Sequence, residues 1–202
     1  MAVFLLIRHG QNDFLDKKLA GRLPGVHLNQ SGQDQAERLA SELAAFPIKA
    51  IYASPLERAR ETAEPIAKSH NLPLKILPTL LEIDFGDWEG KSLDELKQES
   101  GWKVVHEQPS TFVFPGGEGF IDAQERVVNG FLSLSKDYSE KDLVVCVAHS
   151  DVIRLAVAHF LGLPLDNFQK IRIAPASVTV LYLNENQAYF GSINTTLDFP
   201  QL

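Results

Sequence analysis

Short apolar runs alternate with amphipathic helical segments along most of this chain. The clearest runs span residues 3–7 and 143–148, and shorter ones lie at 50–53 and 74–77. Runs of this length bounded by turn residues are typical of buried strands, and apolar residues at helical spacing follow three of them. Strands that alternate with helices predict an α/β fold of three layers, in which helices cover both faces of a mainly parallel central sheet.

Three short patterns predict where helices begin. In each, a serine is followed three residues later by an acid, which is the arrangement of a capping box. The three pairs are Ser31 with Asp34, Ser54 with Glu57, and Ser92 with Glu95. Residues 102–119 show little periodicity and predict a long irregular loop, whereas 178–183 and 188–193 predict a β-hairpin.

The length and composition place the chain among globular proteins. It has 202 residues, of which 45% are hydrophobic, enough for one domain with a substantial core. We expect a single domain over 1–202, with 85–119 as a lid-like insertion, because long loops of this kind often cover sites. Cys146 is the only cysteine and lies in an apolar run, which predicts a buried core residue.

Charge and hydropathy exclude other classes of protein. The formal net charge of −7 argues against a nucleic-acid-binding surface, which needs clustered lysine and arginine. No run is long enough to span a bilayer and no signal peptide opens the sequence, so we expect a soluble cytoplasmic protein without a membrane partner. A homodimer through an edge near the hairpin is left open.

Polar side chains stand where three of the predicted strands end. Arg8 and His9 follow the first strand, Arg58 lies in the first helical turn after the strand at 50–53, and His149 follows the last parallel strand. In an open α/β sheet, ligands gather outside the carboxyl ends of the strands, so these groups converge if the strands are neighbours. The simpler alternative is an incidental basic pair at a strand end and a solvated arginine.

Arg58 is the most informative of these residues. A helix N-terminus favours anionic side chains, so a cation there is unexpected on structural grounds alone. Its position makes sense if the arginine and the helix N-terminus both face an anion. Two arginines and two histidines in one pocket suit a phosphate dianion.

A segment of acids and aromatics predicts a proton donor. Residues 82–90 interleave four acids with Phe85, Trp88 and two glycines. A carboxylic acid beside aromatic surface can have its pKa raised by desolvation, as a general acid requires. Glu82 is the candidate, whereas Asp87 and Glu89 fit a turn with solvated carboxylates.

Taken together, these motifs resemble the histidine phosphatase superfamily, the phosphoglycerate-mutase-like group. The matching residues are Arg8-His9-Gly10, Ser54-Pro55-Leu56 with Arg58, Glu82-Ile83-Asp84-Phe85-Gly86, Trp88-Glu89-Gly90, and His149 before a helix. The resemblance runs from Ala2 to about Pro164, with the motifs in the family's order. The phrase Phe85-Gly86-Asp87-Trp88-Glu89-Gly90 looks most like the small branch that includes alpha-ribazole phosphatase.

The resemblance implies a fold of the phosphoglycerate mutase type and a metal-independent phosphatase without a cofactor. His9 would become phosphorylated, Arg8, Arg58 and His149 would bind the equatorial oxygens, and Glu82 would protonate the leaving oxygen. The substrate would be a small phosphorylated metabolite. The expected substrate-binding residues are Arg8, Gln11, Asn12, Gly21, Arg22, Arg58, Glu82, His149 and Ser150.

Two departures from the family pattern concern the phosphate contacts. Leu15 stands where much of the family has an asparagine, and Asn12 is the candidate substitute. Ser150 and Asp151 replace glycines after the second histidine, where Ser150 could donate to phosphate and Asp151 could cap the helix or narrow the pocket. The alternatives are a cofactor-dependent phosphoglycerate mutase and a non-catalytic phosphate-binding module.

The outer pocket determines the substrate and is the least specified part of the sequence. Arg22, Phe85, Trp88 and the loop 112–120 are candidates to line it, with packing and a solvated loop as their alternative roles.

Overall fold

The computed structural model describes residues 1–196, whose strands form one six-stranded sheet in the order β3-β2-β4-β1-β5-β6. The strands are β1 (Ala2–Arg8), β2 (Ile48–Ala53), β3 (Leu74–Ile76), β4 (Leu143–Ala148), β5 (Val178–Leu183) and β6 (Ala188–Thr195). The α-helices are α1 (Gln30–Leu43), α2 (Glu57–Ser69), α3 (Leu93–Leu96), α4 (Trp102–Glu107), α5 (Phe120–Ser135) and α6 (Ser150–Phe160). Short 3-10 helices are η1 (Pro78–Leu80), η2 (Gly86–Trp88), η3 (Pro109–Thr111) and η4 (Leu165–Lys170).

The sheet is mixed, and its central part is parallel. Strand β4 pairs in parallel with both β1 and β2, and β2 pairs in parallel with β3. Strand β5 runs antiparallel to β1 and forms a hairpin with β6. The predictions of a mainly parallel sheet and of a C-terminal hairpin are therefore confirmed.

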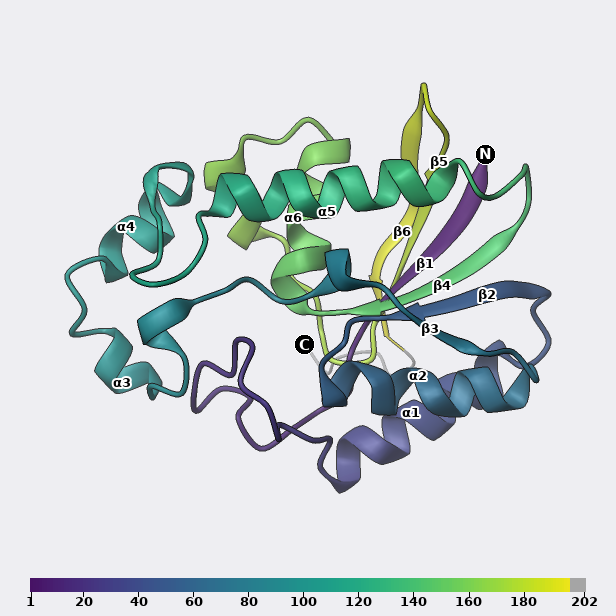
Figure 1. Cartoon of the computed structure of the whole chain (residues 1–202), viewed down its shortest axis with the longest axis horizontal. Helices are drawn as coiled ribbons and strands as arrows, with labels where there is room; N and C mark the ends of the chain where they lie inside the picture. The colour runs from purple at the N-terminus through teal and green to yellow at the C-terminus, as the bar shows by residue number, and fades with distance from the viewer. Residues whose placement is uncertain (197–202) are drawn as a thin grey trace.

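Helices cover both faces of this sheet, as the strand–helix alternation predicted (Figure 1). Successive strand side chains point to opposite faces. Leu5 and Ile7 of β1 pack in a core with α1 and α2, whereas Phe4 and Leu6 pack in a second core with α5 and α6. Cys146 is fully buried in the second core, which confirms its predicted role. Among the helices described over residues 1–196, none has the length and apolar character to cross a membrane.

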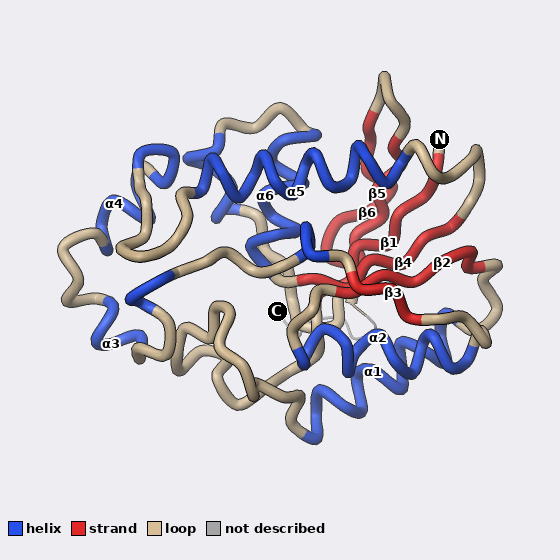
Figure 2. The backbone as a smooth tube through the Cα atoms, viewed as in Figure 1, coloured by secondary structure: helices blue, strands red, loops and turns tan. Residues whose placement is uncertain are grey.

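The segment between β3 and α5 lies beyond the carboxyl ends of the parallel strands (Figure 2). It contains α3 and α4, joined by loops, and packs around a third core that is rich in aromatic residues. The sequence predicted an irregular loop over 102–119, but its first part is the helix α4. From that helix, Trp102, Val105 and His106 line one cavity, and they are three and one positions apart, as on one face of a helix. This helical pattern is short, and the prolines and glycines that follow it hid it in the sequence.

Two of the three predicted helix caps are wrong. Helix α1 begins two residues earlier than predicted, because the side chain of Asn29 accepts the Gly32 N–H at 3.0 Å in place of a Ser31 cap. Helix α2 has Leu56 at its N-cap without a side-chain hydrogen bond, and the Ser54 hydroxyl is used elsewhere. The predicted capping box of Ser92 and Glu95 is confirmed.

Candidate active site

The register of the three central strands brings the predicted site residues to one edge of the sheet. Arg8 is paired with Ala148 across β1 and β4, and Ala53 is paired with Val147 across β2 and β4. The chain leaves all three strands at the same level. His9, Ser54 and His149 are therefore the first residues beyond the sheet on neighbouring strands.

His9 is held as a neutral imidazole with one nitrogen available. Its Nδ1 lies 2.7 Å from the Gly10 carbonyl oxygen, and only a protonated nitrogen can bond there. Burial, followed by the charges of Arg58 and Arg8, lowers the pKa of His9 well below its ordinary value. The proton therefore sits on Nδ1, and Nε2 carries a lone pair that accepts from Arg58 Nε at 3.2 Å.

Arg58 reaches this imidazole from the first turn of α2 and is only 1% exposed. Its Nη2 donates to the Gly21 carbonyl at 2.7 Å, so the guanidinium is oriented by the loop after β1. Arg8 donates through Nη1 to the Ile173 carbonyl at 2.7 Å. Burial lowers the pKa of both arginines, yet both stay cationic because their ordinary value is so high.

His149 packs beside His9, with 5.2 Å between the ring centroids. It is fully buried, and its Nε2 lies 2.8 Å from the Ser54 hydroxyl. Burial, followed by the charge of Arg58, lowers its pKa well below the ordinary value. The Ser54 hydroxyl, which the sequence suggested as a helix cap, thus fixes this ring.

Several buried polar atoms in the site have no hydrogen-bond partner within residues 1–196. They are Arg8 Nε, Arg58 Nη1, His149 Nδ1, Ser150 Oγ and Arg154 Nε. Unsatisfied buried polar groups are rare in native proteins and each one calls for a reason. An anion seated among them would satisfy several at once, and charge-assisted hydrogen bonds to guanidinium groups would hold it firmly.

Glu82 supplies an acid beside these cations. It is 8% exposed, and its Oε1 accepts the Ile83 N–H at 3.0 Å. Burial, followed by the negative charge of Asp151, raises the pKa of Glu82 to about 7, against the opposing effects of that hydrogen bond, Arg58 and Arg8. The carboxyl group can therefore both give and take a proton near neutral pH.

Arg8, His9, Arg58 and Glu82 line a cavity of about 350 Å³, called here the cationic cup. The predicted site residues on its wall are Arg8, His9, Asn12, Gly21, Arg58, Glu82 and Ser150. Asp151 and Arg154 of α6 also line it and form an ion pair at 2.9 Å. Over residues 1–196, no group of three or more His, Cys, Asp and Glu side chains is arranged to hold a metal ion.

Three of the residues predicted to bind substrate are not among those that line the cup: His149, Gln11 and Arg22. His149 is fully buried beside His9, and the other two have different partners. Gln11 lines a different cavity and donates its backbone N–H to Gln35. The Arg22 guanidinium binds the Glu82 carbonyl at 2.8 Å and forms ion pairs with Asp84 and Glu118. Both predictions followed the position of the residues in one loop, which does not show where the side chains turn.

Asn12 does line the cup, but its side chain has a structural task. Its Oδ1 accepts the backbone N–H groups of Phe14 and Leu15, at 3.0 and 3.1 Å. That leaves its amide nitrogen as the group with which it could meet a ligand. Asn12 therefore stabilises the shape of this loop. In the family pattern, the asparagine stands at the position of Leu15 instead.

Thr62 joins the two sides of the site and was not predicted from the sequence. Its buried hydroxyl donates to the Arg58 carbonyl at 2.7 Å and accepts the Gly10 N–H at 3.0 Å. The only available signal was its spacing, one helical turn after Arg58. A hydroxyl at that spacing is common on helices and points to no partner on another strand.

Comparison with known proteins gives the same picture as the geometry. Residues 4–196 match the family described as histidine phosphatase superfamily (branch 1). The chain is 30% identical to phosphoserine phosphatase 1 of Hydrogenobacter thermophilus, covering 97% of this chain and 93% of that one. It is 29% identical to the adenosylcobalamin/alpha-ribazole phosphatase of Escherichia coli, covering 94% of each.

One relative carries a different activity in its name. The 2,3-bisphosphoglycerate-dependent phosphoglycerate mutase of Thermoplasma acidophilum is 32% identical over 90% of this chain and 87% of its own. Among solved structures, Bacillus stearothermophilus YhfR superposes with a TM-score of 0.88 at 29% identity, covering 95% of this chain and 96% of that one. The predicted fold and the predicted resemblance are therefore both confirmed. The chain belongs to branch 1 of the histidine phosphatase superfamily and is an enzyme of the phosphatase type.

Proposed function

We propose that this chain hydrolyses a small phosphomonoester through a phosphohistidine on His9, with Glu82 as the proton donor and without a metal ion. The observation that supports it most is the state of His9. It is a neutral imidazole whose Nε2 lone pair points at Arg58, among buried polar atoms that have no partner. A nucleophile and an anion site thus share one cup.

In the first step, Nε2 of His9 attacks phosphorus in line with the ester oxygen. The N–P bond forms as the P–O ester bond breaks, and Glu82 gives its proton to the leaving oxygen. Arg8 and Arg58 neutralise the equatorial oxygens, and Arg58 turns its Nε from the histidine to the phosphoryl group. Removing one such preorganised donor typically costs about 3 kcal/mol of transition-state stabilisation.

In the second step, the Glu82 carboxylate takes a proton from a water molecule, which attacks the phosphohistidine. The P–O bond to water forms and the N–P bond breaks, so that His9 returns to its neutral form and Glu82 to its acid form. A pKa of about 7 suits one carboxyl group to both roles, because neither protonation state is strongly favoured at neutral pH.

We also propose that residues 85–119 act as a lid-like part of one domain. Phe85 and Leu93 from this segment line the cup, and the segment's own helices lie beyond the ends of the strands (Figure 1). An enclosure of this kind limits water around the reacting groups and strengthens their electrostatic interactions.

A phosphoglycerate mutase is the second candidate, because one relative of similar identity carries that name. A mutase must keep the phosphoryl group on the histidine and return it to a second oxygen, which requires the exclusion of water. A non-catalytic phosphate-binding module is disfavoured, since such a module needs neither a neutral histidine nor a poised acid.

The test measures hydrolysis of p-nitrophenyl phosphate and of an alkyl phosphate in excess chelator. We expect turnover with both, no turnover in His9→Ala, and an acid-labile phosphohistidine in denatured Glu82→Gln. Exposed His159→Ala is the matched control and should behave as the native enzyme. Turnover in His9→Ala would reject the covalent mechanism, and faster phosphoryl exchange on bisphosphoglycerate than hydrolysis would favour the mutase.

A further inference from the structure

A second cavity, of about 390 Å³, adjoins the cationic cup and is called here the aromatic cavity. The two cavities share part of their walls. The shared residues are Leu19, Phe85, Leu93, Asp151 and Arg154. Because Glu82 stands in the cup and must reach the ester oxygen, a leaving group attached to that oxygen would extend along this shared wall.

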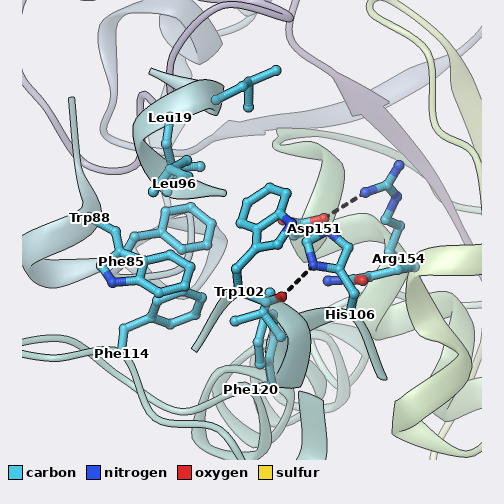
Figure 3. Close-up of a pocket in the computed structure, with 13 residues that line it drawn as sticks. Leu19, Phe85, Trp88, Leu96, Trp102, His106, Phe114, Phe120, Asp151 and Arg154 are labelled. Carbon is cyan, nitrogen blue, oxygen red and sulfur yellow. Dashed lines mark hydrogen bonds and ion pairs between the residues drawn. The ribbon is translucent and has the colours of Figure 1, made fainter. Parts of the chain in front are cut away.

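The aromatic cavity has a preformed apolar wall (Figure 3). The Phe114 ring packs against Phe85, Trp88 and Phe120 with ring centroids 4.9 to 5.3 Å apart. These four side chains are buried, and Trp102 faces them from α4. Rings packed in this way are held by their neighbours, so a guest would meet a surface that needs little reorganisation.

The charges on the walls disfavour an anionic guest. At the shared wall, Arg154 is paired through Nη1 with Asp151 at 2.9 Å, so the pair brings no net positive charge, and its Nε has no partner within residues 1–196. The other basic side chain on the aromatic cavity is exposed His106, whose Nδ1 lies 2.8 Å from the Trp102 carbonyl. Arg8 and Arg58 belong to the phosphate site, and the cup is also lined by Lys18 and Asp16, whose charges are opposite.

We propose that the aromatic cavity receives the leaving group of the substrate, and that this group is uncharged and apolar, with aromatic groups preferred. The inference rests on the proposed function, because the phosphate must occupy the cup for its ester group to reach the second cavity. This preference for an apolar leaving group distinguishes the chain from enzymes that act on carboxylated substrates such as phosphoserine. A carboxylate placed at the shared wall would meet Asp151, whose negative charge offsets that of its ion-pair partner Arg154.

The experiment compares alkyl phosphates whose leaving alcohols have similar acidity. Ethyl, butyl and phenethyl phosphate increase in apolar area, and phosphoglycolate has a carboxylate in place of the methyl group of ethyl phosphate. We expect kcat/KM to rise at least about tenfold from ethyl to phenethyl phosphate, because each methylene in a hydrophobic pocket contributes several-fold or more. Phosphoglycolate should be at least about tenfold poorer than ethyl phosphate.

A variant of α4 assigns the effect to the cavity. Trp102→Ala should remove most of the advantage of phenethyl phosphate and leave ethyl phosphate nearly unchanged. Val104→Ala is the matched control, since Val104 lies on the same helix, is 37% exposed and does not line the cavity. Activity on ethyl phosphate reports in each variant whether the cup is intact.

The outcomes separate the two proposals. The inference would be overturned by equal kcat/KM values across the three alkyl phosphates, by a preference for phosphoglycolate, or by an unchanged preference for phenethyl phosphate in Trp102→Ala. In each of these cases, turnover of ethyl phosphate would still support the phosphatase. Absence of turnover with every phosphomonoester would overturn the proposed function and this inference with it.

Discussion

The Nε of Arg58 donates to Nε2 of His9 at 3.2 Å, so the cation and the proposed nucleophile are in contact before substrate arrives. This contact keeps the histidine unprotonated and places the guanidinium where the phosphoryl group will be transferred. We expect Arg58→Lys to lower kcat/KM by about 10²–10³-fold, because an ammonium group lacks the planar set of donors.

The neighbouring arginine of α2 supplies the control for this change. Arg60 is exposed and forms a surface ion pair with Glu64 at 3.9 Å. Arg60→Lys should therefore leave kcat/KM within about twofold. Equal losses in both variants would contradict the role given to Arg58. NMR titration of His9 adds a second readout, since loss of the Arg58 charge in Arg58→Ala should raise the pKa of His9.

The pH dependence follows from Glu82 and Asp151. The proton donor is present below the Glu82 pKa of about 7 and is lost as pH rises through it, so kcat/KM for an alkyl phosphate should fall above about pH 7. On the acid side His9 stays neutral well below its ordinary pKa. Asp151→Asn removes a negative charge that raises the Glu82 pKa, so the alkaline limb should move to lower pH.

The measurement is kcat/KM against pH with an alkyl phosphate, whose departure needs a proton. With p-nitrophenyl phosphate the alkaline limb should weaken, because nitrophenolate leaves without one. The Asp122→Asn variant is the control, since Asp122 is exposed on α5 and does not line the cup. An unmoved limb in Asp151→Asn would show that this carboxylate does not act on Glu82.

Much of the site follows from local sequence because Arg8, His9 and His149 stand at strand ends. The apolar runs that end at Arg8 and at Ala148 predicted the strands, and a parallel sheet places such ends at one edge. The position of Arg58 in a first helical turn predicted an anion for a similar local reason. These predictions required only short segments of sequence and the rule that the carboxyl ends of parallel strands meet at one edge of the sheet.

Contacts between segments far apart in the chain could not be predicted in this way. The Ser54 hydroxyl fits a helix cap by its local pattern, but the buried His149 offers it a partner 95 positions away. Arg22 was assigned to substrate, yet its guanidinium binds Glu82, Asp84 and Glu118 across loops whose relative positions no period reveals. Tertiary packing determines the partners of both side chains.

Two arginines from distant parts of the chain hold the backbone of the proposed acid. Arg22 and Arg126 both donate to the Glu82 carbonyl, at 2.8 and 3.5 Å, and Glu118 binds both guanidinium groups, at 2.8 and 2.7 Å. We expect Glu118→Gln to lower the free energy of unfolding by about 1–3 kcal/mol, because two half-buried cations lose their shared counterion.

Urea unfolding measures this loss, and the pH profile of the same variant shows whether Glu82 is displaced. Glu125→Gln, an exposed acid on α5 beside Arg126, should change the free energy of unfolding by less than about 0.5 kcal/mol. A Glu118 variant as stable as this control would mean that the arginines are held by the backbone carbonyls alone.

Thr62 makes the last prediction, because its buried hydroxyl serves two backbone groups of the site at once. Thr62→Val keeps the shape of the side chain but leaves the Gly10 N–H without its acceptor, which should cost about 1–3 kcal/mol of stability. Activity should fall as well, since the Gly10 carbonyl fixes Nδ1 of His9. Thr62→Ser retains the hydroxyl and should restore activity more fully than it restores stability, as it lacks a buried methyl group. If the serine variant is no more active than the valine variant, the hydroxyl does not position His9 and Thr62 acts through packing alone.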